Sequence, residues 1–153
     1  MIRVVLTCLL AVAIAGVVFP AADAARADAT TVKVGSMADD IAHAATALAA
    51  AEDPTPAGVA GARRHVVLDV PAGSWRAAGV SNLTVRGGDG VELAAGVAGG
   101  PTVVRRVGGP RTRVAGDRLV LEPGEHRLRL TLEADAGGSV VVIAPATANS
   151  SAA

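Results

Sequence analysis

The pattern of hydrophobic and polar positions changes twice along the chain. The stretch from Val4 to Ala22 is almost wholly apolar and follows a lone Arg3. From Met37 to about Glu52, apolar residues recur at spacings of four and three, which predicts an amphipathic helix. From Arg63 onward, short β-patterned runs alternate with turn residues. We therefore expect an α+β protein with an N-terminal hydrophobic helix, an amphipathic helix and an antiparallel β-sheet or sandwich head of five to seven strands.

This pattern divides the chain into four parts. Residues 1–24 form a signal peptide or membrane anchor, and residues 25–58 form a linker and the amphipathic helix. Residues 59–144 form the β-rich head, and the small, polar segment 145–153 is expected to be a disordered tail. The part that follows the apolar stretch is long enough for one modest domain.

Two interpretations of the apolar stretch stay open. Its length is close to the roughly 20 residues that span a bilayer as a helix, which favours a retained anchor with the head outside the cell membrane. Ala22-Asp23-Ala24 also offers small residues at the spacing that signal peptidase requires. Cleavage there would release a secreted protein that begins at Ala25.

The amphipathic helix carries a seam of apolar residues that is a candidate contact surface. Met37, Ile41, Ala44 and Leu48 fall on one side of it. Such a seam packs either on the sheet of its own domain or against neighbouring subunits. Ser36 fits a capping box, and the β-branched segment Thr30–Val34 favours an extended link, so we expect this helix to begin at Met37. The alternative is a single unbroken helix from the apolar stretch to Glu52.

The strands are expected where β-branched and alternating runs lie between glycine- and proline-containing turns. Leu128, Leu130 and Leu132 alternate with polar residues, which predicts one buried and one solvated face. The segment 74–79 is expected to be one helical turn whose Trp75 covers the core. The expected strands are residues 65–70, 82–86, 90–94, 102–107, 118–122, 127–133 and 139–144, with turns at 71–73, 87–90, 99–101, 108–110, 123–124 and 137–138.

Composition excludes several classes of function. The chain has one Trp, one Phe and no Tyr, and its 14 basic residues balance 14 acidic ones, which argues against a nucleic-acid partner. The single Cys8 excludes an intramolecular disulfide. No nucleophile, carboxylate pair or phosphate-binding loop has the context that catalysis needs, so we expect no enzyme activity and no cofactor.

Some residues still suggest chemistry. His43, His65 and His126 have no second ligand at metal spacing, so no metal site is expected. Four arginines at positions 105, 106, 111 and 113 surround Gly108-Gly109-Pro110, and they form either a solvated hairpin tip or a docking site for an acidic surface or lipid headgroups. Asn82 and Asn149 begin glycosylation sequons, which matter only if the protein is exported.

Several motifs resemble a family of uncharacterised small proteins from halophilic archaea. They are Met1-Ile2-Arg3-Val4-Val5-Leu6, Glu52-Asp53-Pro54-Thr55-Pro56, Gly61-Ala62-Arg63-Arg64-His65-Val66-Val67 and Ser74-Trp75-Arg76-Ala77-Ala78-Gly79-Val80. That family is associated with type IV pilus-like assembly systems. The resemblance implies a membrane-anchored, pilin-like accessory protein without catalytic residues, whose partners are the membrane and other assembly subunits. The leading hypothesis is therefore a non-enzymatic component of a pilus-like or secretion assembly, and the alternative is a secreted β-sandwich binding module.

Overall fold

The fold consists of one long helix and six β-strands. A computed structural model describes residues 2–74 and 77–146, and for residues 15, 17 and 20 it describes the backbone alone. The expected helical turn around Trp75 and most of the expected disordered tail lie outside the described residues. The elements are α1 (Ile2–Ala51), β1 (Arg63–Val70), β2 (Val80–Val97), β3 (Thr102–Val114), β4 (Arg118–Leu121), β5 (Gly124–Asp135) and β6 (Gly138–Pro145).

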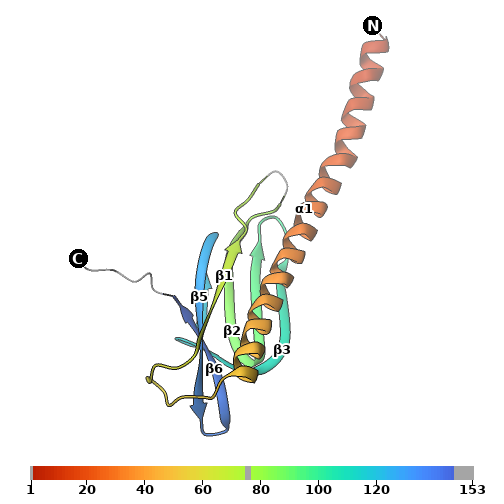
Figure 1. The fold of residues 1–153 in the computed structure, drawn as a ribbon. Helices are drawn as coiled ribbons and strands as arrows, with labels where there is room; N and C mark the ends of the chain where they lie inside the picture. The colour runs from red at the N-terminus through yellow and green to blue at the C-terminus, as the bar shows by residue number, and fades with distance from the viewer. Residues whose placement is uncertain (1, 75–76, 147–153) are drawn as a thin grey trace, which may run out of the picture.

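Helix α1 is continuous from the apolar stretch to the end of the amphipathic segment (Figure 1). The expected extended link at Thr30–Val34 and the expected helix start at Met37 are therefore wrong. Thr30 and Thr31 donate hydrogen bonds from their hydroxyls to the carbonyls of the residues four positions earlier, at 3.0 and 2.9 Å. Ser36 does not cap a helix, because its hydroxyl donates to the Lys33 carbonyl at 2.9 Å. Polar β-branched side chains that bond within the helix in this way are compatible with helical backbone.

The six strands form one sheet in the order β1-β5-β6-β3-β2-β4. Neighbours are antiparallel except β3 and β6, which run parallel from Thr112↔Val141 to Val114↔Ile143. The expectation of a purely antiparallel sheet is therefore wrong at this pair, and a single open sheet replaces the sandwich alternative. The physical reason is that two hairpins, β2–β3 and β5–β6, lie side by side with strands that point the same way.

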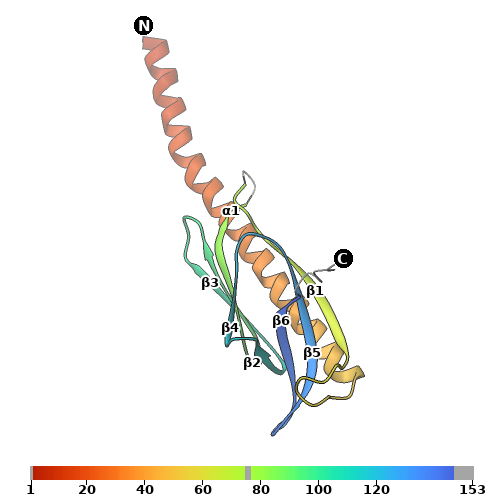
Figure 2. The same cartoon turned by 90° about the vertical axis from the view of Figure 1, so that its left-hand side faces the viewer.

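The core lies between the C-terminal half of α1 and one face of the sheet (Figures 1 and 2). Leu128, Leu130 and Leu132 are buried there, which confirms the alternation expected for this strand. From the helix the core receives side chains at three- and four-residue spacing: Val34, Met37, Ala38, Ile41, Ala45 and Leu48. Helix and sheet thus bury a shared aliphatic interior.

Two glycine-rich segments lie inside strands rather than between them. The segment 87–90 joins the two expected strands on either side into the single strand β2, and the segment 108–110 belongs to β3. The pairing of β2 with β3 shifts between Asp89 and Val91, where Gly90 has a φ of 113°. A glycine at positive φ allows a β-bulge, so the predicted turns at these places are wrong.

The expected turns at 99–101 and 137–138 are confirmed as hairpin connections. Pro123 and Gly124 also lie where one strand ends and the next begins. However, β4 pairs with β2 and β5 pairs with β1 and β6, so this link does not close a hairpin.

Candidate functional site

The apolar seam of the amphipathic segment is part of the domain's own core. Met37, Ile41 and Leu48 are at most 4% exposed, and Ala44 is half-buried against the same cluster. Of the two interpretations that the sequence left open, the structure matches the one in which the seam packs on its own sheet. While the domain is folded, Met37, Ile41 and Leu48 are covered by the sheet, and of the four side chains Ala44 alone is partly accessible.

The N-terminal half of α1 carries a different, exposed apolar surface. This half extends away from the sheet (Figures 1 and 2), and its large side chains are more than half exposed. They are Ile2, Val4, Val5, Leu6, Leu9, Leu10, Val12, Ile14, Val18 and Phe19. A contiguous apolar surface of this kind on a folded protein marks an interaction site.

A search of the described residues for a helix that is both long and apolar enough to cross a membrane finds none.

The junction between the two halves of α1 is fixed by polar contacts to the head. Thr30 is buried and its hydroxyl also donates to the Ala78 carbonyl at 2.8 Å. The Ala78 amide donates to the Arg26 carbonyl at 3.3 Å, and Lys33 forms an ion pair with Asp69. The polar contacts that join α1 to the head therefore extend towards the N-terminus as far as Arg26.

The four arginines expected to form a basic patch are instead paired with carboxylates. Arg105 lies 3.9 Å from Asp39, Arg111 lies 3.6 Å from Asp135, and Arg113 lies 2.8 Å from Glu133, while Arg106 pairs with Glu92. The hypothesis of a hairpin tip is therefore wrong, since β3 continues through residues 108–110. The docking site for an acidic surface or lipid headgroups stays a prediction, now with arginines that already pair with carboxylates. The sequence could not reveal this because the carboxylates come from α1, β2 and β5.

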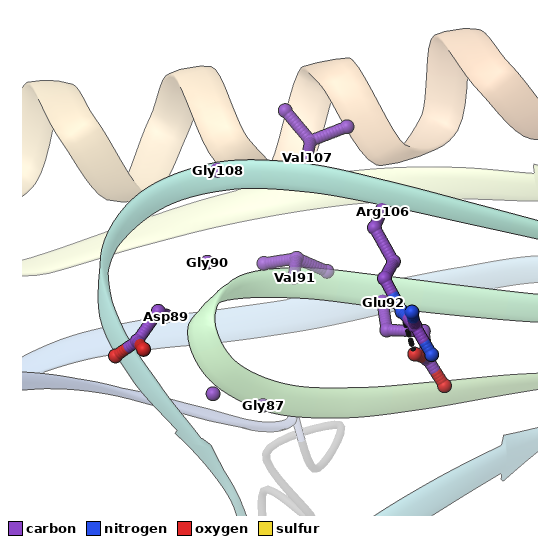
Figure 3. A pocket seen from close by; sticks show the side chains of 9 residues that line it. Gly87, Asp89, Gly90, Val91, Glu92, Arg106, Val107 and Gly108 are labelled. Carbon is purple, nitrogen blue, oxygen red and sulfur yellow. Dashed lines mark hydrogen bonds and ion pairs between the residues drawn. The ribbon is translucent and has the colours of Figure 1, made fainter.

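The strongest polar cluster surrounds Glu92. Its carboxylate accepts from Arg106 and, at 3.3 Å, from Arg86. The Arg106 hydrogen bond, aided by the charges of both guanidiniums, lowers the pKa of Glu92 against a smaller opposing effect of burial. Beside it, the bulge opens a hollow of about 280 Å³ lined mainly by glycines and by Asp89, Val91 and Val107 (Figure 3). A carboxylate held ionised between two guanidiniums is unsuited to accept or deliver a proton near neutral pH.

The histidines do not form a metal centre. Within residues 2–74 and 77–146, no group of three or more potential metal ligands is found. His43 is exposed on α1, His65 is exposed on β1, and the His126 ring lies 2.7 Å from the Glu122 carbonyl through Nε2. The three rings thus lie on separate elements with separate surroundings.

Of the two sequons, only the first can be placed. Asn82 is exposed near the start of β2, and Asn149 lies outside the described residues. Exposure makes Asn82 accessible, which is necessary for glycosylation but is no sign of it.

The geometry defines a class of α+β protein in which a single helix packs by its C-terminal half on one open mixed sheet and extends its apolar N-terminal half away from it. Within that class, the chain belongs to the family described as "Domain of unknown function (DUF7311)", whose model matches residues 1–146. No curated protein and no solved structure matches the chain. The family match spans the helix and the whole sheet.

Proposed function

We propose that this protein is a non-enzymatic, membrane-anchored accessory component of a cell-surface pilus-like or secretion assembly. The observation that carries the proposal is the division of α1 into a half that completes the core and a half that exposes a continuous apolar surface. None of the described side chains of the N-terminal half belongs to the hydrophobic core, so its apolar side chains have a role only when something covers them.

The chemistry of the extending half favours an apolar cover. Its large exposed side chains are all apolar, and between Arg3 and Asp23 it has no charged residue. A helix that is hydrophobic all round requires an apolar surrounding, which lipid or a bundle of equivalent helices supplies. In this proposal the helix inserts among lipid tails before assembly and packs against neighbouring subunits afterwards.

The remainder of the protein supports a structural role. Within the described residues, the Glu92 cluster is neutralised by arginines, and the histidines lie on separate elements. The head thus resembles a rigid unit carried by the helix rather than a container for a substrate. This is the reason to prefer an assembly component over an enzyme.

The alternative of a secreted binding module is supported by one feature. Cleavage after Ala24 would leave the core intact, because the first buried residue of α1 is Thr30. The two proposals therefore predict the same folded head and differ in whether the apolar half stays attached.

A flotation experiment separates them. The full chain is expressed in cells with its N-terminus unmodified, membranes are floated on a density gradient, and the mature N-terminus is identified by mass spectrometry. We expect intact chain in the floating fraction, resistant to carbonate extraction. A matched variant with Leu9→Glu and Leu10→Glu should lose flotation while its head remains folded. Recovery of a soluble form that begins at Ala25 would overturn the proposal in favour of the secreted module.

A further inference from the structure

On the outer face of the sheet, opposite α1, some arginines form ion pairs with carboxylates and others do not. Towards the middle of the sheet, Glu92, Glu133 and Asp135 each form an ion pair with an arginine. Towards the β1 edge, the described residues offer no ion pair to three further arginines. These are Arg63 on β1 and Arg127 and Arg129 on β5, which we call the β1–β5 basic surface.

The strand register gathers this surface into a compact group. Arg129 lies opposite His65, Arg63 lies opposite Thr131, and Arg127 lies opposite Val67. None of the three arginines directly opposes another: Arg63 and Arg129 are diagonal neighbours, about 7–8 Å apart, and Arg127 lies two residues from Arg129 on the same face of β5. Side chains as long as arginine can share one anion across such distances. Alternation places all of these side chains on the face that is turned away from the buried leucines.

A hollow lies beside this surface. Arg63, Arg129, Thr131 and Glu133 line it together with the loop 58–61, and its volume is about 250 Å³. Glu133 is already bound to Arg113, so the polar groups left for an incoming side chain are cationic or hydroxyl. The hollow can admit a carboxylate side chain.

The opposite side of the molecule has the complementary charge. Residues 23–53 contain six acidic residues and two basic ones, whereas residues 63–146 contain eleven arginines and eight acidic residues. Because the buried side of α1 faces the sheet, its exposed side points away from the head. Asp40 is exposed on α1, and Glu52 and Asp53 are exposed directly after the helix ends at Ala51; no ion pair to these three carboxylates is found among the described residues.

We propose that the β1–β5 basic surface binds the acidic side of α1 of a second copy of this chain, with a carboxylate entering the hollow beside Arg63 and Arg129. Charge complementarity favours a second copy as the partner. The chain is neutral overall, yet its basic residues and its acidic residues lie on opposite sides, so the basic side of one copy complements the acidic side of another.

The geometry of the contact has a consequence for assembly. The two surfaces differ and lie on opposite sides, so the contact is head-to-tail, and a head-to-tail contact that does not close into a ring continues as a filament. In the assembly the apolar halves of α1 add to the affinity, whereas the charged contact sets which faces meet and is expected to hold on its own at low salt. The role of such a filament rests on the proposed function. The contact between copies does not, and it can be tested on the isolated protein.

The test uses the full chain in excess mild detergent, so that the apolar half of α1 is covered. Self-association is measured by sedimentation velocity from about 20 mM to roughly 0.5 M salt, over which screening increases strongly. We expect association at low salt that weakens at least tenfold at high salt. The double variant Arg127→Glu/Arg129→Glu and the single variant Asp40→Arg should each lose it, and a 1:1 mixture of the two should regain it.

The control is Arg118→Glu, which makes one such arginine-to-glutamate replacement at an exposed position of the strand at the far edge of the sheet, and it is compared with the single variant Arg129→Glu. It should stay within twofold of the unaltered protein, and circular dichroism verifies that every variant is folded. Failure of the mixture to regain association would overturn the proposal. So would tight binding of heparin by the basic surface in a protein that does not self-associate, which would assign the surface to an anionic polymer. Flotation is scored separately, so loss of anchoring and loss of this contact remain distinguishable.

Discussion

Replacement of Ile41 by alanine tests whether the C-terminal half of α1 is truly part of the core. Ile41 is 0% exposed and lies in the middle of the buried row of the helix. The substitution removes three carbon atoms from a closely packed interior. At about 0.8 kcal/mol for each buried methylene, the transfer term is about 2.4 kcal/mol, and the cavity left behind raises the loss to about 3–4 kcal/mol.

The assay is thermal and urea unfolding of the full chain in mild detergent, followed by circular dichroism. A loss of about 3 kcal/mol is a large share of the 5–15 kcal/mol typical of a domain, and it should lower the melting temperature by about 10 °C or more. The matched control is Val32→Ala, because Val32 is on the same helix and is 73% exposed. It should change stability by no more than about 0.5 kcal/mol.

Equal stability of the two variants would refute the reasoning. It would mean that the helix is not held against the sheet in solution, and that the seam through Met37, Ile41, Ala44 and Leu48 is free for partner subunits. Ala44→Glu is a second test of whether the seam packs on the sheet of its own domain. In the folded domain described here, it should destabilise the head by about 1–3 kcal/mol, since it places a charge at a half-buried position of the core.

Three further predictions concern the sheet. Leu130→Asp places an unpaired charge at a fully buried position and should unfold the domain. Arg129→Asp on the outer face of the sheet should melt within a few degrees of the unaltered protein. Equal melting temperatures of the two variants would contradict the assignment of these residues to opposite faces. The pKa of Glu92 is lowered in the folded protein, so its pairing with arginine stabilises the fold at any pH above the pKa of an unfolded glutamate. This stabilisation is lost as the pH falls through the lower pKa of the folded state. Glu92→Gln should remove this part of the acid dependence of stability, and NMR titration of the carboxyl group measures the pKa itself. Gly90→Ala should destabilise by more than about 1 kcal/mol, because a Cβ at a φ of 113° would collide with the Val107 carbonyl, whereas Gly108→Ala, with open space around it, should be tolerated in the same urea titration.

The elements followed from the sequence where the pattern was local and strong. The alternation around Leu130 predicted a strand with one buried face, and the hairpin turns at 99–101 and 137–138 were predicted from glycine and proline alone. These features depend on neighbouring residues, so nothing distant needed to be known.

The predictions failed where distant residues override local preference. Thr30–Val34 has the β-branched composition of a strand, yet it is helical because its hydroxyls bond within the helix and Val34 packs into the core. Likewise, the segment 87–90 has the composition of a turn, yet it lies inside β2, where the pairing with β3 shifts register between Asp89 and Val91. In both places the deciding neighbour comes from elsewhere in the fold.

Charge compensation on the surface also could not be predicted from sequence spacing. Arg113 and Glu133 are 20 residues apart, and they form an ion pair because β3 and β5 flank β6 in the sheet. The same strand order leaves Arg63, Arg127 and Arg129 together without a carboxylate partner among the described residues. Strand order is set by which hairpins dock, which is a property of the assembled core.

The sequence by itself determined that this protein has an apolar N-terminal segment, an amphipathic segment with a seam and a β-patterned remainder, because hydrophobic periodicity is encoded residue by residue. Only the tertiary structure decided that the first two form one helix, that the seam is buried in its own domain, and that the extending half alone is left exposed. The buried seam and the exposed extending half have the same cause: the apolar face of the sheet packs on the C-terminal half of α1.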